Sequence, residues 1–152
     1  MSLSHRIALL LLLSFAVCQV ALGAQLKILV LDSTNGHGLH NKLVCISFPA
    51  GGVEGPVTNE ARDCHRTDST GTVEFHLTDP VPKAVHVVLG SNGLNPCYSP
   101  ESFDISAALK GGTVAKNTCG EANTTLTEDG EVVVFAHQMS LWESMKARSD
   151  EF

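Results

Sequence analysis

Histidine is the residue type in this sequence that could most readily support chemistry, because an imidazole binds metals and exchanges a proton near neutral pH. The chain of 152 residues contains seven histidines. The closest pair that could chelate a metal is His37 and His40, in a segment that also holds Gly36 and Gly38. A glycine-bearing loop does not hold two imidazoles on one side as a helix would, and a zinc site usually needs three protein ligands. We therefore expect no metal site and no cofactor.

Cysteine is the second residue type that could do chemistry. An even number of cysteines in an exported chain indicates disulfide bonds, and four remain when Cys18 of the apolar N-terminal segment is set aside. Four cysteines allow three connectivities. We favour the pairing in which each disulfide brackets one local excursion of the chain, and the lack of a C-x-x-C spacing argues against zinc. The expected pairs are Cys45 with Cys64 and Cys97 with Cys119.

Other catalytic arrangements are not evident in the sequence. The nucleophile-elbow pattern G-x-S-x-G does not occur, so we predict that the protein is not an enzyme. The alternative is a His-dependent metal-binding protein or a hydrolytic enzyme, which convergence of His37, His40 and His65 on one ion would favour. His76 and His86 are both expected to point outward from their strands, where they could meet if those strands are neighbours.

The N-terminal residues are typical of a secretory signal peptide. Arg6 precedes an apolar run over residues 7–17, and Ala21-Leu22-Gly23 provides a small-x-small cleavage site. We expect cleavage of residues 1–23, a mature start near Ala24, and a secreted or periplasmic protein without a membrane span. An uncleaved N-terminal anchor is the alternative, although the apolar run is short for one.

Length and charge limit what the remaining chain could be. Residues 24–138 are long enough for one β-sandwich domain, followed by a short helical tail over residues 139–152. The formal net charge of the chain is −6 and no basic cluster is present, which argues against nucleic acid as a partner.

Alternating β-strand patterns occupy most of residues 24–138. The segment 72–77 is the clearest, because Val73, Phe75 and Leu77 alternate with polar residues directly after a turn over residues 67–71. Residues 90–127 are expected to form long loops. Further strands are expected at residues 26–32, 42–48, 64–66, 84–89 and 131–137, with 26–32 and 42–48 as antiparallel neighbours and 131–137 as a central strand. Within residues 90–127, only 103–105 and 113–115 look extended.

Two features lie outside these strands. In the tail, Ser140 and Glu143 have the spacing of a capping box, and Trp142 is expected to seal one end of the sandwich rather than to dock a partner. Asn123 begins an N-x-T sequon for glycosylation, which is meaningful only in a eukaryotic source.

Together these signals predict an all-β, antiparallel β-sandwich of about seven strands with a short C-terminal helix. The order of motifs resembles the carboxypeptidase regulatory-like domains, which have a transthyretin-like (prealbumin-like, Ig-like) sandwich. The resemblance lies in the glycine turn between strands 26–32 and 42–48, in the Thr67-Asp68-x-x-Gly71-x-Val73-x-Phe75 hairpin, and in strand 84–89. It covers residues 26–90, and residues 131–137 fit the closing strand.

This resemblance implies a non-catalytic module that binds or scaffolds an unidentified protein or glycan at the cell envelope or outside the cell. Catalytic relatives of the fold do not match at the positions that matter. Hydroxyisourate hydrolases end in Tyr-Arg-Gly-Ser, whereas this chain ends in Ser-Asp-Glu-Phe. Intradiol dioxygenases bind iron through two tyrosines and two histidines, and Tyr98 is the only tyrosine here.

Overall fold

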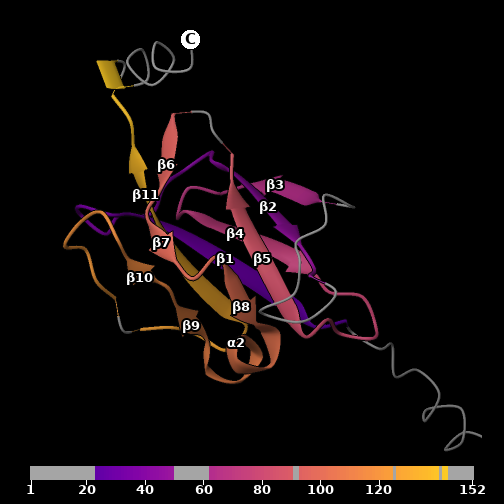
Figure 1. The fold of residues 1–152 in the computed structure, drawn as a ribbon. Coiled ribbons are helices and arrows are strands. Elements are labelled where there is room, and N and C mark those ends of the chain that lie inside the picture. The colour runs from indigo at the N-terminus through magenta and orange to yellow at the C-terminus, as the bar shows by residue number, and fades with distance from the viewer. Residues whose placement is uncertain (1–22, 50–61, 91–92, 125, 141, 144–152) are drawn as a thin grey trace, which may run out of the picture.

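The structure is a computed structural model that describes residues 23–49, 62–90, 93–124, 126–140 and 142–143. In these residues the chain forms two β-sheets packed face to face, with one short helix at the end of the sandwich (Figure 1). The all-β sandwich predicted from the sequence is therefore confirmed. The predicted signal peptide lies in residues that the structure does not describe, apart from Gly23.

Sheet A has five strands and sheet B has four. The strand order in sheet A is β4-β1-β11-β6, and β9 pairs with the other half of β11 on the same side as β6. Its strands are β1 (Gln25–Asp32), β4 (Thr72–His76), β6 (Leu94–Pro96), β9 (Thr113–Val114) and β11 (Glu131–Gln138). Sheet B has the order β3-β2-β5-β8, formed by β2 (Leu43–Ser47), β3 (Asp63–Arg66), β5 (Ala84–Leu89) and β8 (Ser102–Asp104).

Sheet A contains parallel strand pairs, and the expectation that residues 26–32 and 42–48 form neighbouring strands is wrong. β1 pairs with β11 in parallel, with Lys27 opposite Glu131 and Asp32 opposite Ala136, so the sandwich is not purely antiparallel. β1 and β2 are not neighbours either, because they lie in different sheets. Parallel neighbours need a long connection, and here most of the domain separates the two strands. Sequence proximity suggested the wrong partner for β1.

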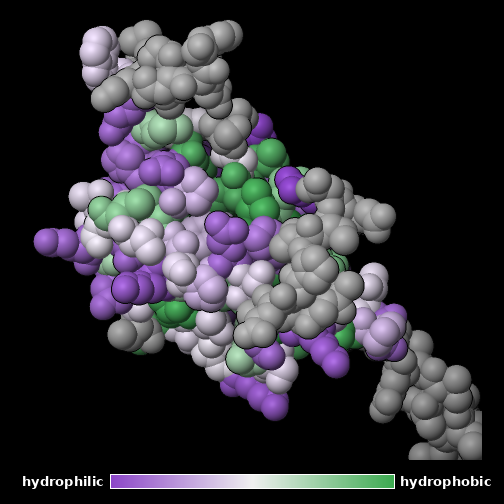
Figure 2. Space-filling view, viewed as in Figure 1, coloured by the Kyte–Doolittle hydropathy of each residue, from purple (hydrophilic) through white to green (hydrophobic). Residues whose placement is uncertain are grey.

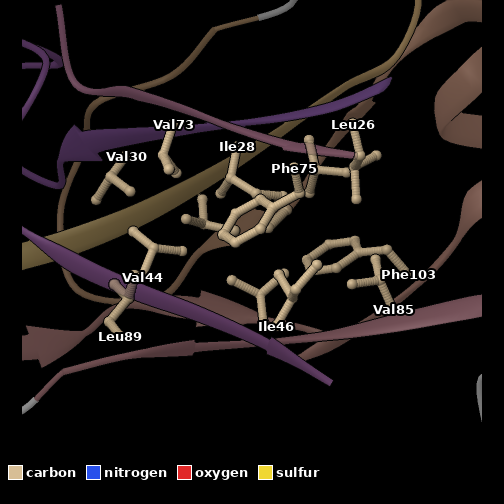
Figure 3. Close-up of a cluster of buried hydrophobic side chains, with 14 of the residues drawn as sticks. Leu26, Ile28, Val30, Val44, Ile46, Val73, Phe75, Val85, Leu89 and Phe103 are labelled. Carbon is tan, nitrogen blue, oxygen red and sulfur yellow. The ribbon is translucent and has the colours of Figure 1, made fainter. Parts of the chain in front are cut away.

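The main core fills the space between the inner faces of the two sheets. From sheet A it receives Leu26, Ile28 and Val30 of β1 together with Val73 and Phe75 of β4, all of them buried (Figure 3). Sheet B contributes Val44, Ile46, Val85, Leu89 and Phe103. The alternation read in residues 72–77 thus places Val73, Phe75 and Leu77 inside, as predicted.

A second apolar cluster covers the outer face of sheet A. It consists of Leu31, Cys97, Val133 and Phe135, with the partly buried Leu29, Val114 and Ala122 packed against them. The segment that supplies the cover includes β7 (Tyr98–Ser99), β9 and β10 (Lys116–Asn117). β11 is consequently buried on both faces, which explains its unbroken apolar run and confirms that it is a central strand.

The region predicted as long loops contains a helix that the sequence pattern does not indicate. α2 (Ile105–Gly111) starts at Asp104, whose Oδ1 accepts a hydrogen bond from Ala107 N at 2.8 Å, and it ends at Gly112 with φ of 70°. Residues 103–104 are extended as expected, but Ile105 is the first helical residue. Seven residues are two helical turns, too few for a helical period to stand out from the surrounding sequence.

Both predicted disulfides form. Cys45 of β2 and Cys64 of β3 are directly opposite each other, with their Cα atoms 4.0 Å apart. Cys97, between β6 and β7, is bonded to Cys119, just beyond β10, with a Cα separation of 5.3 Å. The second disulfide holds the covering segment on the outer face of sheet A, since Cys97 is itself part of the cluster beneath it.

The predicted turn at residues 67–71 depends on one carboxylate. Asp68 Oδ1 accepts hydrogen bonds from Thr70 N at 2.8 Å, Thr70 Oγ1 at 2.6 Å and Thr72 N at 2.9 Å. Gly71 closes the turn with φ of 88°, and a Cβ there would lie 2.7 Å from Val30 O. The Thr70 side-chain hydrogen bond, followed by the backbone amide of Thr72, holds the pKa of Asp68 below its ordinary value.

Replacing Asp68 with Asn should lower the free energy of unfolding at pH 7. The folded state stabilises the ionised carboxylate of Asp68. The contribution of Asp68 to the free energy of unfolding is therefore present above its unfolded-state pKa and disappears as the pH falls through its folded-state pKa. The difference between wild type and variant, measured by urea unfolding across a pH series, should therefore shrink in acid. Asp129→Asn is the matched control, because Asp129 makes no side-chain hydrogen bond within the described chain. A difference that stays constant with pH would contradict this account.

Removing the second disulfide with the double substitution Cys97→Ala and Cys119→Ala should destabilise the protein by about 3 kcal/mol, because the bond closes a loop across 22 residues. Urea unfolding measures the loss. Peptide mapping of the unreduced protein checks the pairing itself, and a Cys45–Cys97 or Cys45–Cys119 peptide would refute it.

Candidate functional site

The histidines proposed as metal ligands do not come together. His37 and His40 are exposed in the connection between β1 and β2. His65 Nε2 lies 2.9 Å from Asp63 Oδ1, and its ring packs edge-on against Phe75 at a centroid distance of 5.2 Å. Among the residues described, no group of three His, Cys, Asp or Glu side chains is placed to hold a metal ion.

His76 and His86 lie in different sheets, so the idea that they meet on neighbouring strands is wrong. His76 ends β4 at the edge of sheet A and is exposed. His86 lies inside sheet B on β5, between β2 and β8. Only a correct assignment of strands to sheets could have separated these two histidines.

His86 is the centre of the one Ser/His/carboxylate arrangement that we find in the described chain. Its Nδ1 is 3.2 Å from Ser102 Oγ, and its Nε2 is 3.8 Å from Glu101 Oε2. Ser47 is the cross-strand neighbour of His86 on its other side, and it is 2% exposed. Ser47 Oγ has no hydrogen-bond partner within the described part of the chain.

This arrangement is poorly suited to nucleophilic catalysis. If His86 acted as a general base, a third group would have to orient its ring by a hydrogen bond. The 3.8 Å between His86 Nε2 and Glu101 Oε2 is too long for a hydrogen bond. The Glu101 side chain is 68% exposed, so solvent screens its effect on His86. The contact between His86 Nδ1 and Ser102 Oγ instead acts as a hydrogen bond that links β5 to β8.

A different kind of site lies where β3 and β4 form one side of the sandwich. β4 is the end strand of sheet A, β3 is the end strand of sheet B, and the contact between His65 and Phe75 brings the two edges together. End strands expose main-chain donors and acceptors that can pair with another chain. β4 lacks the lysines, prolines and bulges by which sheet edges are commonly protected.

The hydrogen-bond pattern identifies which main-chain groups of β4 are free. Leu77 N donates to Ala24 O and Val30 N donates to Gly71 O, so the odd-numbered residues of β4 bond to β1 and the even-numbered ones point away. Thr72 is already satisfied, because Asp68 N donates to Thr72 O and Asp68 Oδ1 accepts from Thr72 N. Within the part of the chain that the structure describes, the N–H and C=O groups of Glu74 and His76 have no main-chain partner, and we call these four groups the free β4 edge.

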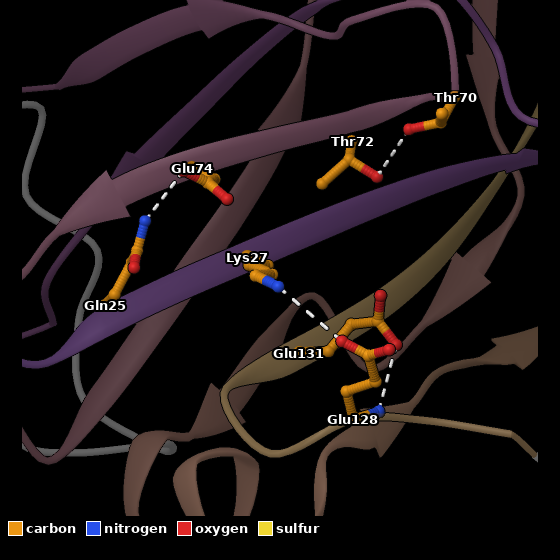
Figure 4. Close-up of polar contacts among 7 residues, drawn as sticks. All are labelled: Gln25, Lys27, Thr70, Thr72, Glu74, Glu128 and Glu131. Carbon is orange, nitrogen blue, oxygen red and sulfur yellow. Dashed lines mark hydrogen bonds and ion pairs between the residues drawn. The ribbon is translucent and has the colours of Figure 1, made fainter.

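Polar contacts fix the side chains beside the free β4 edge. Gln25 Nε2 donates to Glu74 Oε2 at 2.7 Å, and Lys27 on the neighbouring strand lies 3.6 Å from Glu128 (Figure 4). Glu74 is thus held in place by an amide, and the nearest lysine is engaged elsewhere. This leaves a carboxylate and an imidazole exposed side by side, two residues apart on one strand.

The outer face of sheet B offers a second exposed area. Figure 2 shows apolar residues over the neighbouring ends of β2, β3 and β5, and the half-buried Leu43 and Val88 lie there with the Cys45–Cys64 disulfide. Nothing in the described chain indicates what kind of partner would bind to this area.

The tail has the predicted capping box, but Trp142 does not seal the sandwich. Ser140 N donates to Glu143 Oε2 at 2.7 Å and Glu143 N donates to Ser140 Oγ at 3.3 Å. The backbone hydrogen bond from Ser140 lowers the pKa of Glu143. Trp142 is 74% exposed, so the expected packing is wrong. Most of the predicted tail helix lies outside the described residues.

Asn123, the first residue of the sequon, is exposed. No helix in the described ranges has the length and apolar character needed to span a membrane. Compared with family models, with curated proteins and with solved structures, the chain gives no match. The resemblance to carboxypeptidase regulatory-like domains therefore stays a prediction.

Proposed function

We propose that this protein is a non-catalytic binding or scaffolding module of an extracytoplasmic compartment, and that it binds an extended segment of another polypeptide at the free β4 edge. The N-terminal apolar segment and the two disulfides support an oxidising location outside the cytoplasm. Membership of the carboxypeptidase regulatory-like family would agree with this function.

The observation that carries the proposal is the set of main-chain groups on Glu74 and His76 that are unpaired among the described residues. An extended peptide can continue a sheet by bonding to such groups, with affinity from the main chain and specificity from alternate side chains. The free β4 edge is held in position because Val73 and Phe75, which alternate with Glu74 and His76 along β4, are buried in the core. Of the two partner classes expected from the sequence, a protein suits this edge better than a glycan.

Amide hydrogen exchange tests strand addition directly. In dilute protein the amides of Glu74 and His76 should exchange quickly, whereas those of Val73 and Phe75, bonded to β1, should exchange slowly. A seven-residue peptide of alternating threonine and valine is a suitable probe, and it should slow exchange at Glu74 and His76 selectively. The same peptide with N-methylated alternate amides is the control. Unchanged exchange at both positions over millimolar probe concentrations would refute the proposed function.

A hydrolytic function is the second candidate, favoured only by the 3.2 Å contact between Ser102 and His86. Because Glu101 is too distant to orient His86, we expect no covalent labelling of Ser102 by a fluorophosphonate, as judged by mass spectrometry of the intact protein. Labelling that is lost in His86→Ala but retained in the matched variant His76→Ala would overturn the non-catalytic assignment.

A further inference from the structure

We infer that the strand bound at the free β4 edge is β4 of a second copy of this chain, running antiparallel about a twofold axis at Phe75. This inference rests on the proposed function, because it uses the same edge. It adds the identity of the partner and the register of the pairing.

The main-chain groups that remain free select this register. In an antiparallel pair, groups that point outward must face one another, and Thr72 is excluded because Asp68 satisfies it. With the axis at Phe75, Glu74 of one copy faces His76 of the other, and the reverse holds at the symmetric position. All four groups of the free β4 edge on each copy are then paired, giving four hydrogen bonds across the interface.

The side chains favour the same register. Glu74 and His76 both lie on the exposed face of β4, so each interface pair sets a carboxylate opposite an imidazole, which can donate a hydrogen bond to it. An axis at Glu74 would instead set Glu74 opposite Glu74 and direct His76 at the satisfied Thr72. An axis at His76 would set two imidazoles opposite each other. The side-chain hydrogen bonds and the main-chain hydrogen bonds therefore favour the same register.

The polar contacts on the β1 side of β4 are compatible with this pairing. Gln25 holds Glu74 from the β1 side, away from the open edge, and Lys27 is bonded to Glu128. A twofold contact of this kind is isologous and closes after two copies. It joins the two five-stranded sheets into one continuous sheet and removes the free β4 edge from solvent.

The first experiment measures the oligomeric state by sedimentation velocity over a concentration series, using the full chain after any natural cleavage. We expect a reversible dimer. His76→Pro removes the outward N–H and should abolish the dimer, whereas the control His76→Ala removes the same imidazole but keeps the N–H and should weaken it only. Circular dichroism establishes that each variant is folded. A dimer that survives in a folded His76→Pro protein would place the interface elsewhere and overturn the inference.

Exchanging the two side chains tests the register without touching the main chain. H76E alone sets Glu opposite Glu and should weaken the dimer about tenfold, since two cross-strand pairs are lost. The swapped variant E74H/H76E restores both pairs and should recover most of the affinity. If the swap fails to recover affinity while H76E weakens the dimer, the register centred on Phe75 is wrong.

The outcomes separate this inference from the proposed function. A protein that is monomeric at all concentrations, but whose Glu74 and His76 amides are protected by the peptide probe, binds strands from other proteins and refutes only the dimer. A monomer that shows no protection with the probe refutes both.

Discussion

The parallel pairing of β1 with β11 is the contact on which the rest of the structure depends. It joins the first and the last strands of the sandwich over six residue pairs, so it closes nearly the whole domain into one sheet contact. It also decides what lies on either side, because β4 then occupies one edge of sheet A, while β6 and β9 share the other. The doubly buried β11 provides apolar surface to both the main core and the outer cluster.

The two edges of sheet A are consequently treated very differently. At the β6 and β9 edge, the chain continues into a segment that folds back over the outer face and is held there by the Cys97–Cys119 disulfide. At the β4 edge no described segment pairs with the strand, and the Asp68 turn satisfies only its first residue. The Cys97–Cys119 disulfide thus stabilises the segment at one edge of sheet A, whereas main-chain hydrogen-bonding groups stay exposed at the other edge. The capacity of sheet A to bind another strand is therefore concentrated at Glu74 and His76.

The histidines illustrate how sequence can suggest chemistry that a fold does not assemble. Six of them follow the N-terminal segment, and the fold places them apart. His37 and His40 are exposed in a loop and His76 is exposed on β4, whereas His65 contacts Phe75, His86 is hydrogen-bonded to Ser102, and His137 Nε2 lies 3.5 Å from Glu143 Oε1. Tyr98 is likewise a polar residue with a structural role. Its hydroxyl donates to Val87 O at 2.8 Å, and burial raises its pKa. His86 and Tyr98 thus both use their polar groups to link β5 to a neighbouring segment.

The sequence by itself determined the local features: the Asp68 turn, the inward side of residues 72–77 and the central position of β11. It favoured, among three possible connectivities, the two disulfides that form. Each depends on residues close in sequence or on a side-chain period, which a single chain displays directly. Only the tertiary structure decided that β1 pairs with β11, that His76 and His86 lie in different sheets, and that α2 interrupts the predicted loops. The physical reason is that alternation specifies which face of a strand is buried but not which strand lies beside it. Main-chain hydrogen-bonding groups are the same in every residue, so the location of a free edge is invisible until all the strands are paired.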